Sequence, residues 1–187
     1  MILFLVILSV LCTTLNALEI VCTPAVIARD GWGFGTEEPT CGKPLIGAAS
    51  KVIIHQTGGN SCPETSCDTI LQGIRDSHMA ERNLKDIAYN FLIDDNGNVY
   101  EGRGWVTLGY YAKYYDKGVI SIAFIGNFKD TAPLKAAQDA ARNLIACGKA
   151  NLVIAENADL EGFQDPETVK PDSELGKAIT AELIVTP

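Results

Sequence analysis

The hydrophobic residues of this chain recur with two periods, one typical of β-strands and one typical of α-helices. Short apolar runs rich in β-branched residues predict strands at 51–55, 89–93, 98–102 and 118–126. The last run, "GVISIAFIG", is apolar on both faces, which is typical of a strand in the middle of a sheet. Helical spacing predicts helices at 67–82, from Pro133 to Gly148, and at about 173–184.

These elements follow one another without repeats or low-complexity linkers. In the first helix Ile70, Ile74 and His78 fall on one stripe, with Leu71 beside it. An irregular arm is expected at 18–49, before the first strand. The pattern predicts a single α/β domain, in which a central mixed β-sheet is flanked by about three helices. A length of 187 residues with 47% hydrophobic residues suits one core of this size.

The segment "DDNGN" lies between the strands predicted at 89–93 and 98–102. Its Asp and Asn residues resemble part of a calcium-binding loop. However, its glycine comes too early, and no carboxylate closes a twelve-residue loop. A plain turn of a β-hairpin is therefore the expectation here.

The first 17 residues, "MILFLVILSVLCTTLNA", form an unbroken apolar stretch with a small-residue ending. This pattern predicts a signal peptide at 1–17, cleaved before Leu18, and a mature domain at 18–187. An uncleaved membrane anchor is the alternative, but the run is shorter than the ~20 residues that a spanning helix needs. We expect a secreted, extracellular and soluble mature protein.

The charge of the chain excludes two classes of partner. The formal net charge is −8, and the predicted signal peptide contains no charged residue. Nucleic-acid affinity depends on many Lys and Arg contacts to phosphate, and anionic membrane surfaces also attract basic segments. We therefore expect neither nucleic acid nor, after cleavage of the signal peptide, a membrane as a partner.

The cysteine residues fit an oxidising compartment. Of the six in the chain, Cys12 lies in the predicted signal peptide, which leaves five. In a secreted protein these are better interpreted as disulfides than as metal thiolates. Cys62 and Cys67 are close enough in sequence for a small disulfide loop, and Cys147 needs a distant partner. The odd count leaves one thiol, for which Cys41 is the candidate.

Four segments, taken together, resemble a known family. They are "VIIHQT" at 52–57, "DIAYNFLI" at 86–93, "VYEGRGW" at 99–105 and "SIAFIGNF" at 121–128. In this order and spacing they resemble the peptidoglycan recognition proteins, which share the fold of the zinc-dependent N-acetylmuramoyl-L-alanine amidases. The resemblance covers roughly 20–185. It implies an amidase-like fold, a role in innate immunity, and disulfides Cys62–Cys67 and Cys22–Cys147.

The amidase members of this family bind zinc through a histidine that matches His55 and through a later histidine and cysteine, assisted by a tyrosine that matches Tyr89. In this chain Phe163 stands at the second histidine position, and Pro171 stands at the cysteine position. A one-residue gap would place Lys170 there instead. Catalytic zinc requires three protein ligands, and the chain has only two histidines. We expect neither a metal, nor a cofactor, nor a catalytic residue, with a zinc amidase as the alternative.

The resemblance also implies a cleft that binds the stem peptide of peptidoglycan with its N-acetylmuramic acid. The matching positions are His55, Thr57, His78, Arg82, Asn83, Leu84, Tyr89 and Tyr111. Arg82 can bind a peptide carboxylate through a bidentate fork, and Leu84 offers an apolar wall. Two structural alternatives stay open: His78 as a hydrogen-bonded core histidine, and Arg82 as a solvated cation at a helix end.

Departures from the family pattern leave the choice of ligand open. Tyr111 replaces a histidine that many members place in the cleft. A second hypothesis is a decoy or regulator that binds a protein partner, such as another recognition protein. Its candidate surface consists of tyrosines, for which ordinary loop packing is the alternative: Tyr110, Tyr111, Tyr114 and Tyr115.

The pair Asn83-Leu84 bears on the type of peptidoglycan. In the family, the two residues after the cleft arginine discriminate the third residue of the stem peptide. An Asn-Phe pair goes with lysine, and a Gly-Trp pair goes with diaminopimelate. The resemblance therefore implies a preference of this chain for Lys-type stem peptides.

Overall fold

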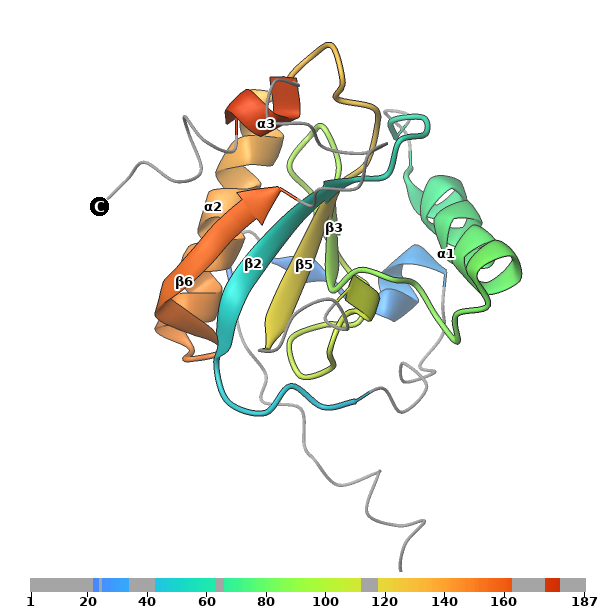
Figure 1. Ribbon diagram of the computed structural model, residues 1–187. Helices are drawn as coiled ribbons and strands as arrows, with labels where there is room; N and C mark the ends of the chain where they lie inside the picture. The colour runs from blue at the N-terminus through green and yellow to red at the C-terminus, as the bar shows by residue number, and fades with distance from the viewer. Residues whose placement is uncertain are drawn as a thin grey trace, which may run out of the picture.

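A computed structural model of the protein describes residues 22–23, 25–33, 43–62, 66–111, 118–162 and 174–178. These residues form a mixed sheet with helices on both faces, as the sequence predicts (Figure 1). The elements in chain order are β1 Val26–Ile27, η1 Arg29–Trp32, β2 Ala49–Gln56, α1 Asp68–Arg82, β3 Phe91–Ile93, β4 Val99–Glu101, β5 Val119–Phe124, α2 Lys135–Ala150, β6 Ile154–Gly162 and α3 Glu174–Ala178.

The sheet has the strand order β1-β4-β3-β5-β2-β6. Only β3 and β4 run antiparallel; the other neighbouring strands of the described sheet are parallel. The β3–β4 pair is the predicted hairpin, with Leu92 opposite Tyr100. In its turn, Asp94 Oδ1 accepts hydrogen bonds from the backbone amides of Asn96 and Asn98. The acidic residue thus stabilises a plain turn, as expected, rather than a calcium loop.

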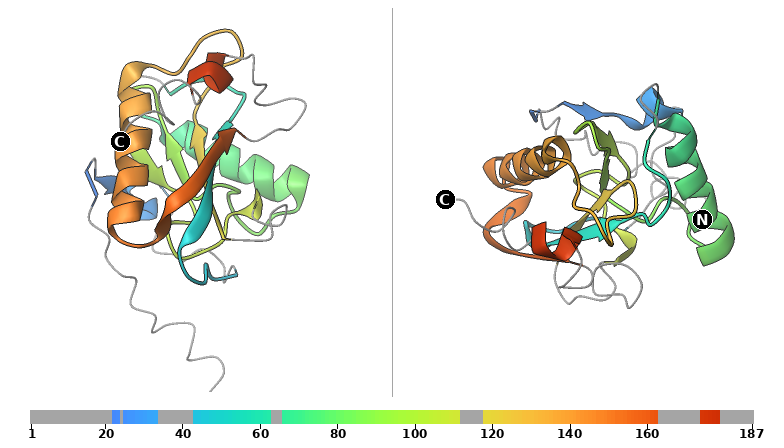
Figure 2. Two further views of the ribbon diagram at one scale, coloured as in Figure 1. Left: turned by 60° about the vertical axis from the view of Figure 1, so that its left-hand side comes forward. Right: turned by 90° about the horizontal axis from the view of Figure 1, so that it is seen from above.

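Alternate residues along the strands face opposite helices. Ile54 and Ile122 pack into one core together with the buried alanines and Leu144 of α2. Leu92 and Ala123 point to the other face, where they share a second core with Leu71 of α1. The side chains of a strand alternate with period two, so these β-branched runs supply both cores at once. The view from above shows α1 and α2 on opposite sides of the sheet (Figure 2).

Several elements differ from the sequence-based expectations. The arm predicted as irregular contains β1 and η1, and the prediction missed β6 entirely. β6 is an edge strand with exposed polar residues such as Glu156 and Asp159, so it lacks the apolar run by which the other strands are recognised. Only 174–178 of the helix predicted at 173–184 lies within the described residues.

The helix α2 extends to Ala150, two residues beyond the predicted stop at Gly148. A Cβ atom at Gly148 would lie 2.6 Å from Cδ1 of Ile154. The glycine is therefore needed for the close packing of α2 against the start of β6, and it does not end the helix. This tertiary contact cannot be read from the local sequence.

Two disulfides, one long-range and one local, cross-link the fold. Cys22 is bonded to Cys147 of α2, and Cys62 is bonded to Cys67, directly before α1. These are the pairs that the resemblance implies. Cys41 and the predicted signal peptide lie outside the described residues. Within the part of the chain that the structure describes, no helix has the length and hydrophobicity of a membrane span.

Candidate functional site

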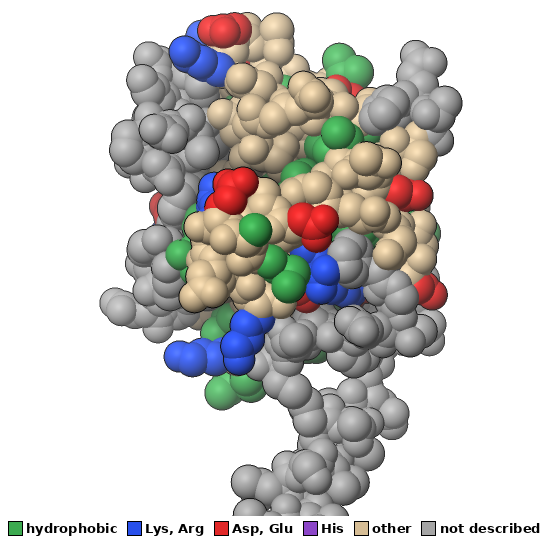
Figure 3. Space-filling view, turned by 90° about the vertical axis from the view of Figure 1, so that its right-hand side faces the viewer, with side chains coloured by type: hydrophobic (Ala, Val, Ile, Leu, Met, Phe, Trp, Pro, Cys, Tyr) green, Lys and Arg blue, Asp and Glu red, His purple; other side chains and the backbone are tan. Residues whose placement is uncertain are grey.

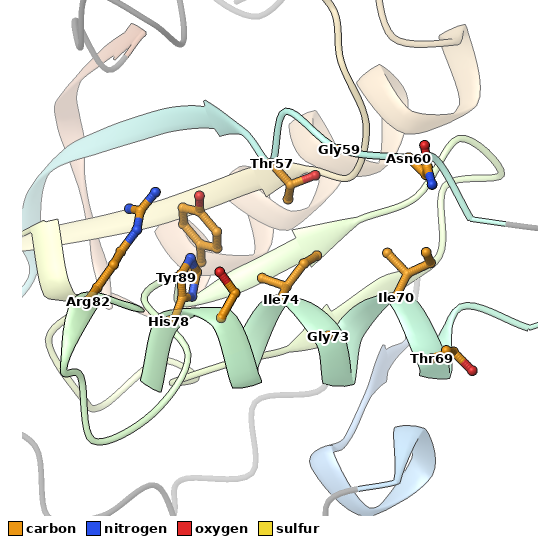
Figure 4. Close-up of a pocket in the computed structure, with 11 residues that line it drawn as sticks. Thr57, Gly59, Asn60, Thr69, Ile70, Gly73, Ile74, His78, Arg82 and Tyr89 are labelled. Carbon is orange, nitrogen blue, oxygen red and sulfur yellow. The ribbon is translucent and has the colours of Figure 1, made fainter. Parts of the chain in front are cut away.

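A cleft of about 310 Å³ lies between α1 and the carboxyl end of β2. Ligands of α/β sheets commonly bind beyond the carboxyl ends of parallel strands, and small-molecule sites begin at about 300 Å³. The close-up shows Thr57, directly after β2, facing the row of side chains on α1 (Figure 4). The cleft is lined by Thr57, Gly59, Asn60, Thr69, Ile70, Gly73, Ile74, Ser77, His78, Arg82 and Tyr89.

One wall of the cleft is a single face of α1. Ile70, Ile74 and His78 are spaced four residues apart and therefore lie one above the other on the helix. His78 is buried, but Ile70 and Ile74 are half-buried and line the cleft. The stripe by which the sequence predicts this helix thus forms one wall of the cleft. Between these side chains, a Cβ atom at Gly73 would meet nothing within 4 Å, so the glycine leaves the wall open.

The turn after α1 is attached to the helix by backbone hydrogen bonds. Asn83 ends the helix in the left-handed conformation, with φ 52°, and the amide of Leu84 donates to the carbonyl of His78. The Nδ1 atom of His78 then accepts a hydrogen bond of 3.1 Å from the amide of Ala88. His78 is therefore a hydrogen-bonded core histidine and also a part of the cleft wall.

A buried carboxylate fixes the same turn from the opposite side. Asp86 binds Nη2 of Arg29 at 2.9 Å and Nε of Arg75 at 2.8 Å. Its Oδ1 atom also accepts a hydrogen bond from the amide of Ile87. Arg29 belongs to η1 and Arg75 to α1, so Asp86 joins the N-terminal arm, the helix and the turn. These contacts hold α1 against the N-terminal arm and the turn that follows the helix.

Behind the cleft, His55 lies in a cluster of aromatic side chains. It projects from β2 opposite Ala123 of β5, whose small side chain leaves room for the ring. The imidazole packs against Tyr111, with centroids 4.2 Å apart, and against Tyr89 at 5.2 Å. Only 1% of His55 is exposed. The rings of Tyr89 and Tyr111 stack with an interplanar angle of 17°.

Both histidines are neutral at physiological pH. Burial, together with the charge of Arg82 and with His78, lowers the pKa of His55 to about 3. Burial, followed by the charges of Arg82 and Arg103, lowers the pKa of His78 to about 4. Burial and the neighbouring Tyr111 also raise the pKa of Tyr89 well above its usual value. The hydroxyl of Tyr89 therefore stays protonated at the edge of the cleft.

Arg82, the last residue of α1, is oriented by Tyr111. Its Nη1 atom donates a hydrogen bond of 3.0 Å to the Tyr111 hydroxyl. The guanidinium group stands beside Tyr89 at one end of the α1 row (Figure 4). Arg82 is thus an exposed residue at a helix end whose charged group has a defined direction, rather than a freely solvated cation.

The structure places the predicted site residues in three groups. Thr57, His78, Arg82 and Tyr89 line the cleft. His55 and Tyr111 lie behind Tyr89 and are almost fully buried. Asn83 and Leu84 lie on the adjoining turn and are absent from the lining.

The sequence analysis did not predict the other residues of the lining. Small residues on α1 near the apolar stripe, such as Gly73 and Ser77, could have indicated that this face of the helix borders a cleft. The lining residues that were not predicted are Gly59, Asn60, Thr69, Ile70, Gly73, Ile74 and Ser77.

The described side chains do not form a zinc site. Among them, no group of three His, Cys, Asp or Glu residues converges on a point where a metal ion could be bound. At His55 the ring packs against Tyr111, and the nearby positive charge of Arg82 opposes a second cation. Phe163, Lys170 and Pro171 lie outside the described residues.

Comparison of the sequence with known proteins shows the family of this chain. The sequence profile of the N-acetylmuramoyl-L-alanine amidase family matches residues 47–172. Peptidoglycan recognition protein 1 of Bos indicus is 35% identical over 158 residues, which cover 83% of this chain and 82% of that protein. This chain belongs to the peptidoglycan recognition protein family. Peptidoglycan-recognition protein SA of Drosophila melanogaster is 36% identical over 156 residues, or 79% of this chain and 73% of that one.

Solved structures of family members share the fold. The bumblebee peptidoglycan recognition protein SA has a TM-score of 0.74 and 34% identity, covering 87% of this chain and 97% of that one. The recognition protein LE, solved in complex with tracheal cytotoxin, a monomeric diaminopimelic acid-type peptidoglycan, also has a TM-score of 0.74. It is 28% identical and covers 87% of this chain and 96% of that one.

The outer face of the molecule on the α1 side carries no single type of charge. Acidic, basic and hydrophobic side chains are interspersed there among other residues (Figure 3). Such a mixed surface does not resemble the continuous basic stripe of a nucleic-acid-binding protein.

Proposed function

We propose that this family member is a secreted pattern-recognition protein of innate immunity, which binds the muramyl stem peptide of bacterial peptidoglycan without hydrolysing it. The observation that carries the proposal is the cleft beside α1. It combines an apolar wall, hydroxyl groups and one cation, and relatives with this fold have been solved with peptidoglycan fragments.

The chemistry of the cleft suits a short peptide that carries a carboxylate. Ile70 and Ile74 offer apolar surface to a peptide side chain such as the alanine methyl group. Thr57 offers a hydroxyl group to a peptide carbonyl, although its Oγ1 already accepts a hydrogen bond from the amide of Gly126. The Tyr89 hydroxyl is hydrogen-bonded to Tyr111, so Tyr89 contributes mainly its ring to the cleft wall. Arg82 supplies the positive charge for a carboxylate. Pockets of this type bind mainly through apolar contact and select through a few placed polar groups.

Binding without hydrolysis is supported by the shortage of zinc ligands. The chain has two histidines, and by the family resemblance Phe163 and Pro171 stand at the later ligand positions. Neither side chain can bind zinc. His78 uses its Nδ1 atom to accept a hydrogen bond from Ala88, and it faces the cleft from α1 rather than from the sheet. Without an activated water, the amide bond of the ligand stays intact.

Secretion is supported by two features of the sequence. Residues 1–17 have the pattern of a signal peptide. The two disulfides, Cys22–Cys147 and Cys62–Cys67, suit an oxidising compartment. Expression of the full chain in animal cells, followed by N-terminal sequencing of the protein in the medium, tests this part. Mature protein that begins at Leu18 supports it, whereas retention in the cells contradicts it.

A pull-down on insoluble peptidoglycan tests binding itself. The wild-type protein should sediment with peptidoglycan, and Arg82→Ala should sediment much less, because the cleft loses its cation. Arg142→Ala is the matched control, because Arg142 lies on α2, on the opposite face of the sheet. Equal sedimentation of wild-type protein and Arg82→Ala would contradict binding in the cleft. No sedimentation of the wild type would favour the decoy hypothesis.

A further inference from the structure

Arginines that lie near the C-terminal half of α1 differ in their partners. Arg29 and Arg75 both form ion pairs with the buried carboxylate of Asp86. Arg82, among the described residues, has no carboxylate within ion-pair distance and instead donates a hydrogen bond to the hydroxyl of Tyr111. A tyrosine hydroxyl orients a guanidinium group without neutralising its charge. Among the described residues, the charge of Arg82 is therefore available to an anion, in a direction set by Tyr111.

Tyr111 is held firmly enough to act as this support. Only 5% of it is exposed, and its ring packs against His55 and Tyr89. The backbone amide of the preceding residue, Tyr110, donates a hydrogen bond to the carbonyl of Ala88. The amide of Ala88 in turn donates to Nδ1 of His78. The hydroxyl of Tyr111 is thus placed by both the sheet and the turn after α1.

A glycine allows the loop that carries Tyr111 to lie this close to the sheet. A Cβ atom at Gly109 would be 2.6 Å from both Asn90 Oδ1 and Ser121 Oγ. The side chain of Asn90, fully buried, donates to the carbonyls of Gly104 and Thr107 and so fixes the loop. Tyr111 is consequently a fixed part of the fold, and the pairing with Arg82 constrains Arg82 rather than Tyr111.

The remaining lining of the cleft is uncharged. Apart from Arg82 it consists of small, hydroxyl, amide and apolar side chains, together with His78, which is neutral. A planar guanidinium group that is oriented at one nitrogen presents its other N–H groups as a directed fork. Such a fork binds a carboxylate through two hydrogen bonds, but a carboxamide offers only one acceptor oxygen.

We propose that Tyr111 is a specificity-determining residue, which orients Arg82 so that the cleft selects ligands with a free carboxylate over the same ligands with a carboxamide. This inference rests on the proposed function, since the ligand is taken to be a muramyl peptide. Tyr111 acts through Arg82 and is a positioning residue rather than a catalytic one. A histidine, which many family members have at this position, has no hydroxyl group that could accept the hydrogen bond from Arg82.

Calorimetry with two muramyl tripeptides tests the proposal on the full-length mature protein. One ligand has all its carboxyl groups free, and in the other each of them is an amide. Because a carboxylate accepts both hydrogen bonds of the guanidinium fork and carries the opposite charge, the wild type should prefer the free acid by ~10-fold or more. Tyr111→Phe keeps the buried ring and removes only the hydroxyl, so this preference should fall to roughly threefold or less.

Two further variants show whether Tyr111→Phe acts through the orientation of Arg82 or through a general disturbance of the fold. In an Arg82→Ala background, Tyr111→Phe should leave the ratio of the two affinities unchanged. Tyr100→Phe is the control, because it removes another buried hydroxyl, one that binds Asp94 away from the cleft. An unchanged preference in Tyr111→Phe, with both ligands still bound, would overturn the proposal and leave the proposed function intact. Failure of the wild type to bind either ligand would overturn the proposed function itself.

Discussion

The ring of His55 packs against that of Tyr111 with a centroid distance of 4.2 Å. By the family resemblance, the histidine at this position binds zinc in the amidase members. In this structure its ring belongs to a buried aromatic cluster behind the cleft. The hydroxyl of the same Tyr111 binds Arg82. The side chain of Tyr111 thus contacts both the buried histidine and the arginine of the cleft.

The two buried histidines should make the stability of the protein depend on pH. Their folded-state pKa values of about 3 and 4 lie below the value of about 6.5 expected in the unfolded chain. Below pH 6.5 the unfolded chain therefore takes up protons that the folded protein does not. Between pH 7 and pH 5 the free energy of unfolding should fall by roughly 1–2 kcal/mol for each histidine, and above pH 7 this contribution should be constant.

Urea unfolding at a series of pH values measures this dependence. His55→Gln replaces one imidazole by a neutral side chain of similar size, so it should remove about half of the slope between pH 5 and 7. A wild-type stability that is constant over this range would show that the histidines are protonated as easily in the folded protein as in the unfolded chain.

Asp86 should be important for stability, because it neutralises buried charge. Asp86→Asn leaves Arg29, of which 7% is exposed, without its anionic partner. Breaking a buried pair in this way costs about 3–5 kcal/mol. Asp139→Asn, at an exposed ion pair on α2, is the control and should change stability little. Chemical denaturation of both variants tests this, and similar small losses for the two would refute a structural role of Asp86.

The long-range disulfide should stabilise the protein more than the short one. Cys22–Cys147 closes a loop with a sequence separation of 125, and the chain-entropy model gives about 3–5 kcal/mol for loops of such length. The Cys62–Cys67 loop, with a separation of 5, should contribute less. Thermal unfolding of the two double Cys→Ser variants compares them. Peptide mapping without reduction should yield both pairs, and a Cys41–Cys147 peptide would disprove this pairing.

The sequence predicts most of the central sheet and the two long helices, because their hydrophobic periods reflect burial directly. It predicts less well where tertiary contacts decide. β6 is polar and becomes a strand by pairing with β2, while Gly148 serves packing against Ile154 rather than helix termination. Neither effect has a local sequence pattern.

The sequence also predicts only part of the cleft, because some of its residues are brought together by tertiary contacts. Thr57, His78, Arg82 and Tyr89 match family positions and do line the cleft. Ile70 and Ile74 have the spacing of core residues, and only the gap between α1 and the sheet reveals that they face a cavity. The contact between Arg82 and Tyr111 joins residues 29 positions apart, and no pattern in the sequence indicates it.

The Asn83-Leu84 pair should favour Lys-type over diaminopimelate-type muropeptides. The extra carboxylate of diaminopimelate needs a polar partner, and leaving it unmet beside Leu84 costs on the order of 1–3 kcal/mol. A preference of about tenfold or more follows, since ~1.4 kcal/mol corresponds to one decade. Asn83→Gly combined with Leu84→Trp should narrow the difference. Calorimetry with both muropeptides measures it, and equal affinities or the reverse preference would show that the pair does not select the ligand here.

The central claim is that the cleft binds a muramyl peptide and leaves it intact. The most direct measurement incubates the purified mature protein with a Lys-type muramyl tripeptide, with and without added zinc. Ultrafiltration then gives the bound fraction, mass spectrometry gives the state of the ligand, and metal analysis gives the zinc content. We predict saturable binding, an unchanged ligand mass in both conditions and no stoichiometric zinc. Release of free stem peptide, together with one zinc ion per chain, would contradict the account.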